Sequence, residues 1–257
     1  MRFNPSLQTV IRFVLPAGLG VLLVACSGGE SRPNPGASTN AGGSGSCETS
    51  RGNPTPNLLA NAGFEQGREP WITLAPESGF QISTAQAHSG GSSALLQMRD
   101  PAEASGAKVY YLVQEITPKE MPELICGYYR VENWVKGSRH QYVQAVAIAF
   151  APSNFPNQEA GGFPNYQIRF LLAGTDSPPF AIENGKFVFV TREEPVQGQW
   201  VPFELRLRDS FQELWGAAPE GFEKLRLLFE VRWDNKVAGA GPAQADAYYD
   251  DLYTGDG

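Results

Sequence analysis

The stretch "LRLLFEVRW", at Leu225–Trp233, alternates between apolar and polar positions along most of its length. One face of this segment carries five apolar residues: Leu225, Leu227, Phe229, Val231 and Trp233. The other face carries three charged residues and one leucine: Arg226, Leu228, Glu230 and Arg232. Because successive side chains of a strand point to opposite faces, this alternation predicts a half-buried β-strand.

Eight further runs of β-branched and aromatic residues lie between turn residues, at 93–98, 108–116, 125–136, 142–150, 166–173, 186–190, 200–208 and 247–253. Short strands that follow one another without long intervening helices are typical of an antiparallel β-sandwich, so the predicted fold class is all-β. The exception is 209–222, where Asp209 or Ser210 can cap a short helix and Pro219 can end it.

The chain has 257 residues, of which 20 are basic and 27 are acidic, for a formal net charge of −7. Its basic residues are scattered rather than gathered on one segment. A nucleic-acid partner is therefore not expected. Simple solubility accounts for the acidic balance.

Residues 1–25 are predicted to be a lipoprotein signal peptide. The apolar segment Phe13–Ala25 would span only about 20 Å as a helix, which is short of the roughly 30 Å hydrocarbon layer. It ends in Leu23-Val24-Ala25-Cys26, which resembles a bacterial lipobox. This resemblance implies that Cys26 is lipidated and becomes the mature N-terminus, and Ser27 after it implies the outer membrane. The alternative is an ordinary exported protein with an incidental cysteine.

Residues 26–56 are rich in Gly, Ser, Pro, Asn and Thr and show no apolar periodicity. Such a segment buries too little apolar surface to offset its ordering entropy, so it is predicted to be a disordered tether. A flexible chain of this length reaches about 30 Å. The folded domain is expected at 57–257.

The stretch "NLLANAGFEQGREPW", at Asn57–Trp71, resembles the first strand of CenC-type carbohydrate-binding modules, which belong to the galactose-binding-like jelly rolls. Three further segments resemble later parts of the same modules in the same order: "AHSGGSSALLQM", "YYLVQEI…GYYRVENWVKG" and "ADAYYDDLY". The resemblance implies a jelly-roll sandwich for most of the domain. The stretch Ser153–Pro195 departs from the family pattern, and inserted loops are expected there.

The resemblance also implies a structural Ca²⁺ ion. Its ligands would be Glu65 and Asp250 or Asp251, with backbone carbonyls between His88 and Ser92. Carboxylates and carbonyls are the hard oxygen ligands that Ca²⁺ prefers. The alternative is that these carboxylates only accept hydrogen bonds in turns.

Two cysteines remain if Cys26 is lipidated. An even pair in an oxidising compartment suggests a disulfide between Cys47 and Cys126 that holds the end of the tether to the domain. The alternative is two unrelated cysteines, with Cys126 simply buried.

The resemblance further implies glycan binding on an outer sheet face or at edge loops. In 128–136, strict alternation predicts that Trp134 faces outward, flanked by Arg130 and Glu132, as a platform for a sugar ring. A register error of one residue would invert this assignment. Residues of other strands could complete the surface: Tyr142, Gln144, Arg169, Glu230 and Arg232. Trp71 and Trp200 are expected in the core. Loop aromatics are rival binders: Phe155, Phe163 and Tyr166.

Motifs of catalysis are scarce. The chain has no G-x-S-x-G, H-E-x-x-H or C-x-x-C pattern, and His88 and His140 are its only histidines. These observations favour a lipid-anchored envelope protein whose domain binds a glycan without catalysis. The alternatives are a jelly-roll glycoside hydrolase or polysaccharide lyase, in which two carboxylates would act, and a structural partner-binding module of the envelope.

Overall fold

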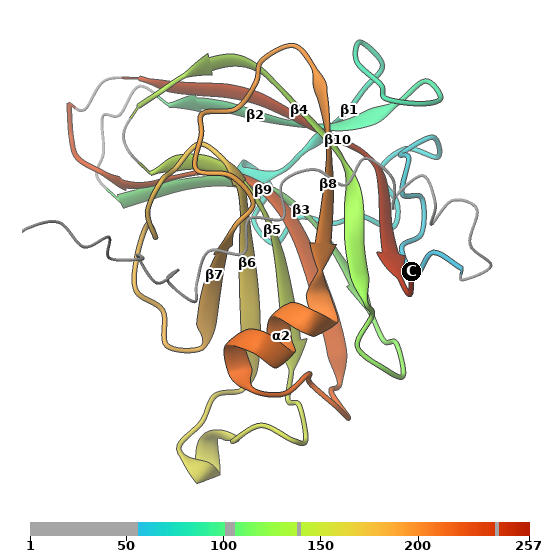
Figure 1. The fold of residues 1–257 in the computed structure, drawn as a ribbon. Helices are drawn as coiled ribbons and strands as arrows, with labels where there is room; N and C mark the ends of the chain where they lie inside the picture. Colours follow the sequence, from blue (N-terminus) through green and yellow to red (C-terminus); the bar gives the residue numbers. More distant parts are fainter. Residues whose placement is uncertain (1–55, 101–105, 138–139, 240–241) are drawn as a thin grey trace, which may run out of the picture. The chain divides into compact units, whose positions relative to one another are not determined.

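The computed structural model describes residues 56–100, 106–137, 140–239 and 242–257 (Figure 1). The predicted signal peptide, the predicted tether up to residue 55, and with them Cys26 and Cys47, lie outside these ranges. Within the described ranges, no helix combines the length and the apolar character needed to cross a membrane.

The described residues form two five-stranded sheets (Figure 1). Sheet A has the order β3 (Gly106–Ile116), β9 (Lys224–Lys236), β5 (Gln141–Phe150), β6 (Asn165–Ala173) and β7 (Gly185–Phe189). Sheet B has the order β1 (Gln81–Ser83), β2 (Ser93–Asp100), β10 (Ala243–Gly255), β4 (Leu124–Val135) and β8 (Trp200–Arg206). This arrangement confirms the predicted all-β sandwich.

All nine strands predicted from the apolar runs are present, and two features of the sheets differ from expectation. The three-residue strand β1 was not predicted, because its apolar pattern is too short to recognise. The pair β6–β7 is parallel, whereas every other strand pair in the described sheets is antiparallel. A parallel pair needs a crossover connection, and the long connection at 174–184 provides it.

The helix α2 (Leu207–Trp215) begins and ends earlier than predicted. Its N-cap is Arg206 rather than Asp209 or Ser210, because the buried side chains of Leu207 and Phe211 hold the first turn against the core. It ends at Gly216, which adopts the left-handed conformation (φ 83°) that favours glycine at this position. Two short 3-10 helices, Pro76–Ser78 and Gln158–Ala160, complete the described helical elements.

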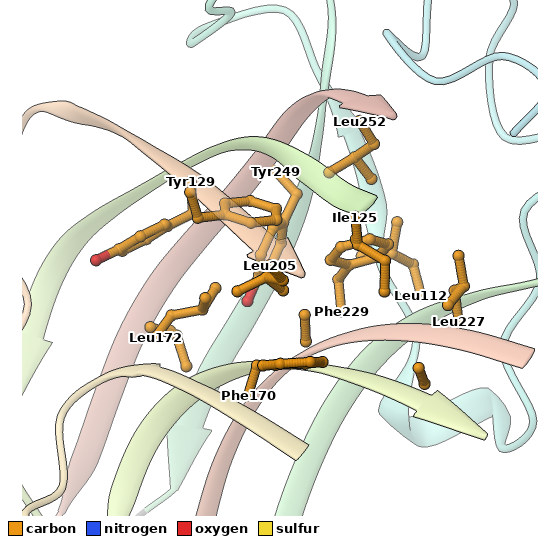
Figure 2. Close-up of a cluster of buried hydrophobic side chains, with 14 of the residues drawn as sticks. Leu112, Ile125, Tyr129, Phe170, Leu172, Leu205, Leu227, Phe229, Tyr249 and Leu252 are labelled. Carbon is orange, nitrogen blue, oxygen red and sulfur yellow. The ribbon is translucent and has the colours of Figure 1, made fainter. Parts of the chain in front are cut away.

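The core lies between the two sheets (Figure 2). Figure 2 shows Phe170, Leu227 and Phe229 of sheet A facing side chains of sheet B such as Ile125 and Tyr249. The predicted inner face of β9 is confirmed, since all five of its apolar residues are buried: Leu225, Leu227, Phe229, Val231 and Trp233.

The opening stretch 57–71 is a compact series of turns rather than the predicted first strand. The Asn61 side chain organises it, donating to the carbonyls of Gly67 (2.8 Å) and Glu69 (2.7 Å). These bonds turn the chain so that Phe64 enters the core, where its ring lies 5.4 Å from that of Trp71. Both rings are almost wholly buried, which confirms the core position predicted for Trp71.

Cys126 lies in β4, is fully buried and is disulfide-bonded. The reading in which it is an unpaired buried thiol is therefore wrong. The chain's other cysteines, Cys26 and Cys47, lie outside the described residues. The pairing of Cys47 with Cys126 thus stays a prediction.

Candidate functional site

The turn at 88–92 receives Glu65 of the opening stretch. Glu65 Oε1 accepts hydrogen bonds from the backbone N–H groups of Gly91 (2.9 Å) and Ser92 (2.9 Å). The same carboxylate lies so close to Gly90 that a Cβ added there would be 2.3 Å from Oε1. Glycine at position 90, with φ 63°, therefore lets this turn approach the carboxylate.

The two aspartates of β10 hold the same turn. Asp250 Oδ2 accepts hydrogen bonds from the backbone N–H groups of His88 (2.7 Å) and Ser89 (3.3 Å). Asp251 contacts the His88 ring through Oδ2 (2.6 Å) and accepts a bond from the Ser89 hydroxyl through Oδ1 (2.7 Å). Glu65 lies near the start of the domain and the two aspartates lie near its end. The turn at 88–92 therefore links the two ends through hydrogen bonds.

An irregularity in β10 allows both aspartates to reach this turn. Neighbouring residues of a regular strand point to opposite faces. The pairing of β10 with β4 shifts register between Asp250 and Tyr253, and Asp251 has a φ of 49°. This bulge turns the Asp251 side chain to the same side as Asp250.

The carboxylates of the predicted Ca²⁺ site hold the turn through hydrogen bonds. Glu65 Oε1 and Asp250 Oδ2 face backbone N–H groups, and Asp251 faces the His88 ring and the Ser89 hydroxyl. Among the described residues, no group of three or more His, Cys, Asp or Glu side chains is arranged to hold a metal. Burial raises the pKa of the Asp250 carboxyl to about 6, with the neighbouring charge of Asp251 adding to the rise. Calcium binding stays a prediction from the resemblance alone.

The calcium prediction is tested by thermal unfolding. Because hydrogen bonds to all three carboxylates already hold the turn in place, we expect the same midpoint with EGTA and with millimolar calcium. A Glu65→Gln variant is a matched probe, since the amide oxygen keeps an acceptor for Gly91 and Ser92 while the charge is lost. A midpoint that rises with calcium in the wild type but not in Glu65→Gln would establish the metal site after all.

The seven predicted ligand-binding residues fall into two separate groups. Arg130, Glu132 and Trp134 belong to β4 of sheet B. The remaining four belong to neighbouring strands of sheet A: Tyr142 and Gln144 in β5, and Glu230 and Arg232 in β9. They do not form the single surface that was expected.

Trp134 packs against the core, so the prediction that it faces outward as a sugar platform is wrong. The cause is a bulge at Asn133, which has a φ of 53° where the pairing of β4 with β10 shifts register. The bulge inverts the alternation, so that Val135, predicted inside, is 45% exposed. The Trp134 Nε1 atom also donates to Glu194 Oε2 at 2.8 Å.

Arg130 and Glu132 lie before this bulge, on the outer side of sheet B. Their charges are engaged with each other, since Arg130 Nε donates to Glu132 Oε1 at 2.8 Å. Trp200, predicted in the core, belongs to neither hydrophobic core cluster of the described residues. Its ring instead lies 5.8 Å from His88 and 6.4 Å from Tyr248.

The rival loop aromatics pack together rather than forming an open platform. Tyr166 is buried, and its ring lies 4.7 Å from Phe155, 5.9 Å from Phe163 and 5.0 Å from Trp215 of α2. Phe155, Phe163 and Trp215 pack against the core. The expectation that these residues bind a ligand is therefore not supported by their placement.

The outer face of sheet A does bring four predicted residues together. Tyr142 pairs in register with Arg232, and Gln144 pairs with Glu230. The Tyr142 hydroxyl donates to Asp234 Oδ2 at 2.6 Å, and Gln144 Nε2 donates to Glu230 Oε2. Burial, reinforced by Asp234, holds the pKa of Tyr142 well above its usual range, so the hydroxyl stays a donor.

Asp234 and Arg169 complete this group. Arg232 donates to both oxygens of Asp234, from Nε (2.7 Å) and Nη2 (2.9 Å). Nη1 of Arg169 and Nη1 of Arg232 each lie 4.0 Å from Glu230 Oε2. We call the six residues the polar cluster of sheet A: Tyr142, Gln144, Arg169, Glu230, Arg232 and Asp234.

Phe180, which sequence reasoning missed, forms a wall beside the polar cluster. It lies in the connection between β6 and β7, and its ring centre is 5.5 Å from the guanidinium carbon of Arg169 and 5.1 Å from that of Arg232. Phe187 of β7 packs edge-on against it at 5.3 Å. The only sequence signal was that Phe180 lies in the stretch that departs from the family pattern.

An open pocket of about 610 Å³ continues from the polar cluster. Its lining includes Phe180, Arg232, Asp234, Asn235 and Lys236. Its volume lies within the roughly 300–1,000 Å³ of ordinary small-molecule sites. The outer face of sheet A therefore combines a pocket, an aromatic wall and buried polar groups.

No model of a known protein family matches the chain, and no curated protein matches it. Solved structures do. The structure of TmCBM61 in complex with beta-1,4-galactotriose is 12% identical, with a TM-score of 0.42, over 77% of this chain and 97% of that one. The CBM22-1 xylan-binding domain from Paenibacillus barcinonensis Xyn10C is 17% identical, with a TM-score of 0.38, over 79% of this chain and 97% of that one.

A glycoside hydrolase domain is also among the similar structures. That of Endo-D from Streptococcus pneumoniae R6 is 11% identical, with a TM-score of 0.30, over 72% of this chain and 21% of that one. With TM-scores below 0.5, these similarities do not decide what this chain binds.

Proposed function

We propose that the domain binds a glycan, without catalysis, on the outer face of sheet A. The observation that carries this proposal is the polar cluster beside Phe180, because six hydrogen-bonding side chains on the outside of a sheet serve no packing role in the core. Sites for small ligands combine apolar and aromatic walls with a few placed polar groups, and this face has both.

A glycan suits this chemistry. Sugar rings present apolar faces that stack on aromatic side chains, and hydroxyls that both donate and accept hydrogen bonds. Phe180 and Phe187 supply aromatic surface at one side, while Arg232 and Asp234, which line the pocket, supply donors and an acceptor.

The arrangement of the carboxylates favours binding over hydrolysis. A glycosidase needs two carboxyl groups placed on either side of the scissile bond. Here Asp234 is occupied by Arg232 and Tyr142, and Glu230 by Gln144. Both carboxylates therefore support other side chains of the face.

We also propose, from the lipobox resemblance, that Cys26 anchors the protein in the outer membrane of a bacterial envelope. Two or three acyl chains would hold it firmly, since one chain alone binds only marginally. The measurement is the recovery of wild type and Cys26→Ser in the membrane fraction, and equal recovery would remove the anchor.

Calorimetric titration of the full-length protein, solubilised in detergent, against a glycan panel tests the proposed function, with product analysis on the same samples. We expect binding without release of smaller sugars. Phe180→Ala should weaken it by about five- to tenfold or more, since one aromatic contact contributes about 1 kcal/mol beyond its area. Phe155→Ala, in the separate aromatic cluster, is the control. Turnover would instead identify an enzyme, and absence of any binding would favour a structural module.

A further inference from the structure

We propose that the outer face of sheet B around Cys126 is an intramolecular docking surface, occupied by residues 47–55 of the predicted tether. This inference does not depend on glycan binding, and it assigns a partner to a face that the proposed function leaves unused. Three observations carry it: an outward-facing cysteine that is buried and disulfide-bonded, the residues that cover its neighbours, and the place where the described chain begins.

Cys126 points away from the core of the sandwich. Its neighbour Ile125 belongs to the core cluster and faces the other sheet (Figure 2). Because successive side chains of a strand point to opposite faces, Cys126 points to the outside of sheet B. It is nevertheless 0% exposed, and it is disulfide-bonded. The partner sulfur of a disulfide lies about 2 Å away, so the partner's chain runs over this point of the outer face.

Other described residues cover the outward positions on either side of Cys126 in β4. A Cβ added to Gly257 would be 2.7 Å from Leu124 Cδ1, so the end of the chain lies against Leu124. The ring of His88 stacks on that of Tyr128, with centres 3.5 Å apart. The disulfide partner of Cys126 therefore lies between two described covers of the same strand.

The described chain begins close to this position. Asn57 Nδ2 donates to the carbonyl of Leu252 (2.9 Å), and Asn57 Oδ1 accepts from the backbone N–H of Thr254 (3.1 Å). Thr254 in turn pairs with Ile125 of β4. Two strand spacings, about 10 Å in all, thus separate Asn57 from β4. The predicted tether therefore joins the domain beside Cys126.

Cys47 is the partner that this geometry favours. The chain has three cysteines, so the partner is Cys47 or Cys26. Cys47 lies ten residues before Asn57, and ten residues span up to about 33 Å, so Cys47 reaches Cys126 with length to spare. Cys26 would close a longer loop at a greater entropic cost. Lipidation of Cys26, as proposed above, would also leave its sulfur unable to form a disulfide.

Docking at Cys126 keeps the tether away from the pocket. Val135 lies nine residues beyond Cys126 in β4, which is about 30 Å along the strand. Val135 pairs with Gln244 at that end of sheet B, where Asp100 is ion-paired with Lys236 of the pocket lining. The tether thus leaves from the other sheet and the other end, and the pocket stays open to a ligand. The undocked part of the tether shortens to 26–46, with a reach of about 25 Å.

Disulfide mapping of the full-length protein tests the choice of partner. Digestion with trypsin and Glu-C without reductant places the three cysteines in separate peptides, because Glu30 lies between Cys26 and Cys47. Mass spectrometry should find the Cys47 peptide linked to the Cys126 peptide of the same chain. A link from Cys26 to Cys126 would overturn this inference and the lipid anchor together. A link between two chains would overturn it in favour of a second copy.

Limited digestion of the native full-length protein with Glu-C, in detergent, tests the docking itself. Glu48 follows Cys47 in the docked segment, whereas Glu30 lies in the undocked part. A docked backbone must leave its surface before a protease can cut it. We expect cleavage after Glu48 to be about tenfold or more slower in the wild type than in Cys47→Ser. Cleavage after Glu30 is the control and should proceed equally in both proteins.

A synthetic peptide of residues 38–56, with its Cys47 blocked, gives the cleavage rate of the same bond in a free chain. The comparison with wild type therefore holds even if Cys47→Ser fails to fold. Wild type should again be about tenfold or more slower than the peptide after Glu48. Equal rates would show that the segment is not docked and would overturn the inference, while the proposed glycan binding and lipid anchor would stand.

Discussion

Replacing Phe64 with alanine should lower the free energy of unfolding by about 3–5 kcal/mol, the usual cost of truncating a buried aromatic ring. Phe64 is fully buried and its ring packs against Trp71 at 5.4 Å. For a domain of this size, the midpoint of thermal unfolding should fall by on the order of 10 °C. Chemical denaturation, followed by tryptophan fluorescence, gives the free energy directly.

The loss should be large because Phe64 secures the opening stretch. Phe64 adopts a left-handed backbone conformation (φ 61°). Alanine also has a Cβ, so the substitution does not relieve the backbone strain at this position. The change therefore reports packing rather than backbone strain. The control is Leu74→Ala, at a site that is 50% exposed, which should change stability by less than about 0.5 kcal/mol. A similar effect of both variants would show that Phe64 does not hold the opening stretch to the core.

Arg232→Ala should have the second large effect, on both stability and binding. Arg232 donates twice to Asp234, which is only 4% exposed, and it lies 4.0 Å from Glu230. Its removal leaves buried carboxylates without their cation, a change that typically costs about 3–5 kcal/mol. It also removes one wall of the pocket, so glycan affinity should fall by about tenfold or more.

Two variants give this experiment its controls. Arg226→Ala removes a more exposed ion pair with Glu115 on the same strand face and should cost no more than about 1 kcal/mol. Arg232→Lys restores the charge without the two-pronged geometry, so it should recover part of the stability. If Arg232→Ala lowers the free energy of unfolding no more than Arg226→Ala does, the stability of the polar cluster does not depend on Arg232.

The candidate site was only partly predictable from sequence. Tyr142, Gln144, Glu230 and Arg232 were predicted to contribute to an outer binding surface, with the last two on the polar face of 225–233, and the structure pairs them across β5 and β9. The same reasoning failed for Trp134. One left-handed residue, Asn133, shifts the register of β4 and inverts every assignment after it.

Phe180 could not have been placed from sequence at all. It lies in a connection without apolar periodicity, and its position depends on the parallel pairing of β7 with β6. The resemblance placed Glu65 near the turn at 88–92, and the alternative reading had these carboxylates accept hydrogen bonds in turns; which N–H groups donate to Glu65, those of Gly91 and Ser92, came only from the structure.

By itself, the sequence determined the nine main strands, the apolar face of β9 and the all-β class, because alternation with a period of two is a local property of the chain. The tertiary structure decided which outer face carries the polar cluster, where bulges invert the alternation, and which loop supplies the aromatic wall. These depend on hydrogen bonds and packing between segments far apart in the chain, which local periodicity does not encode.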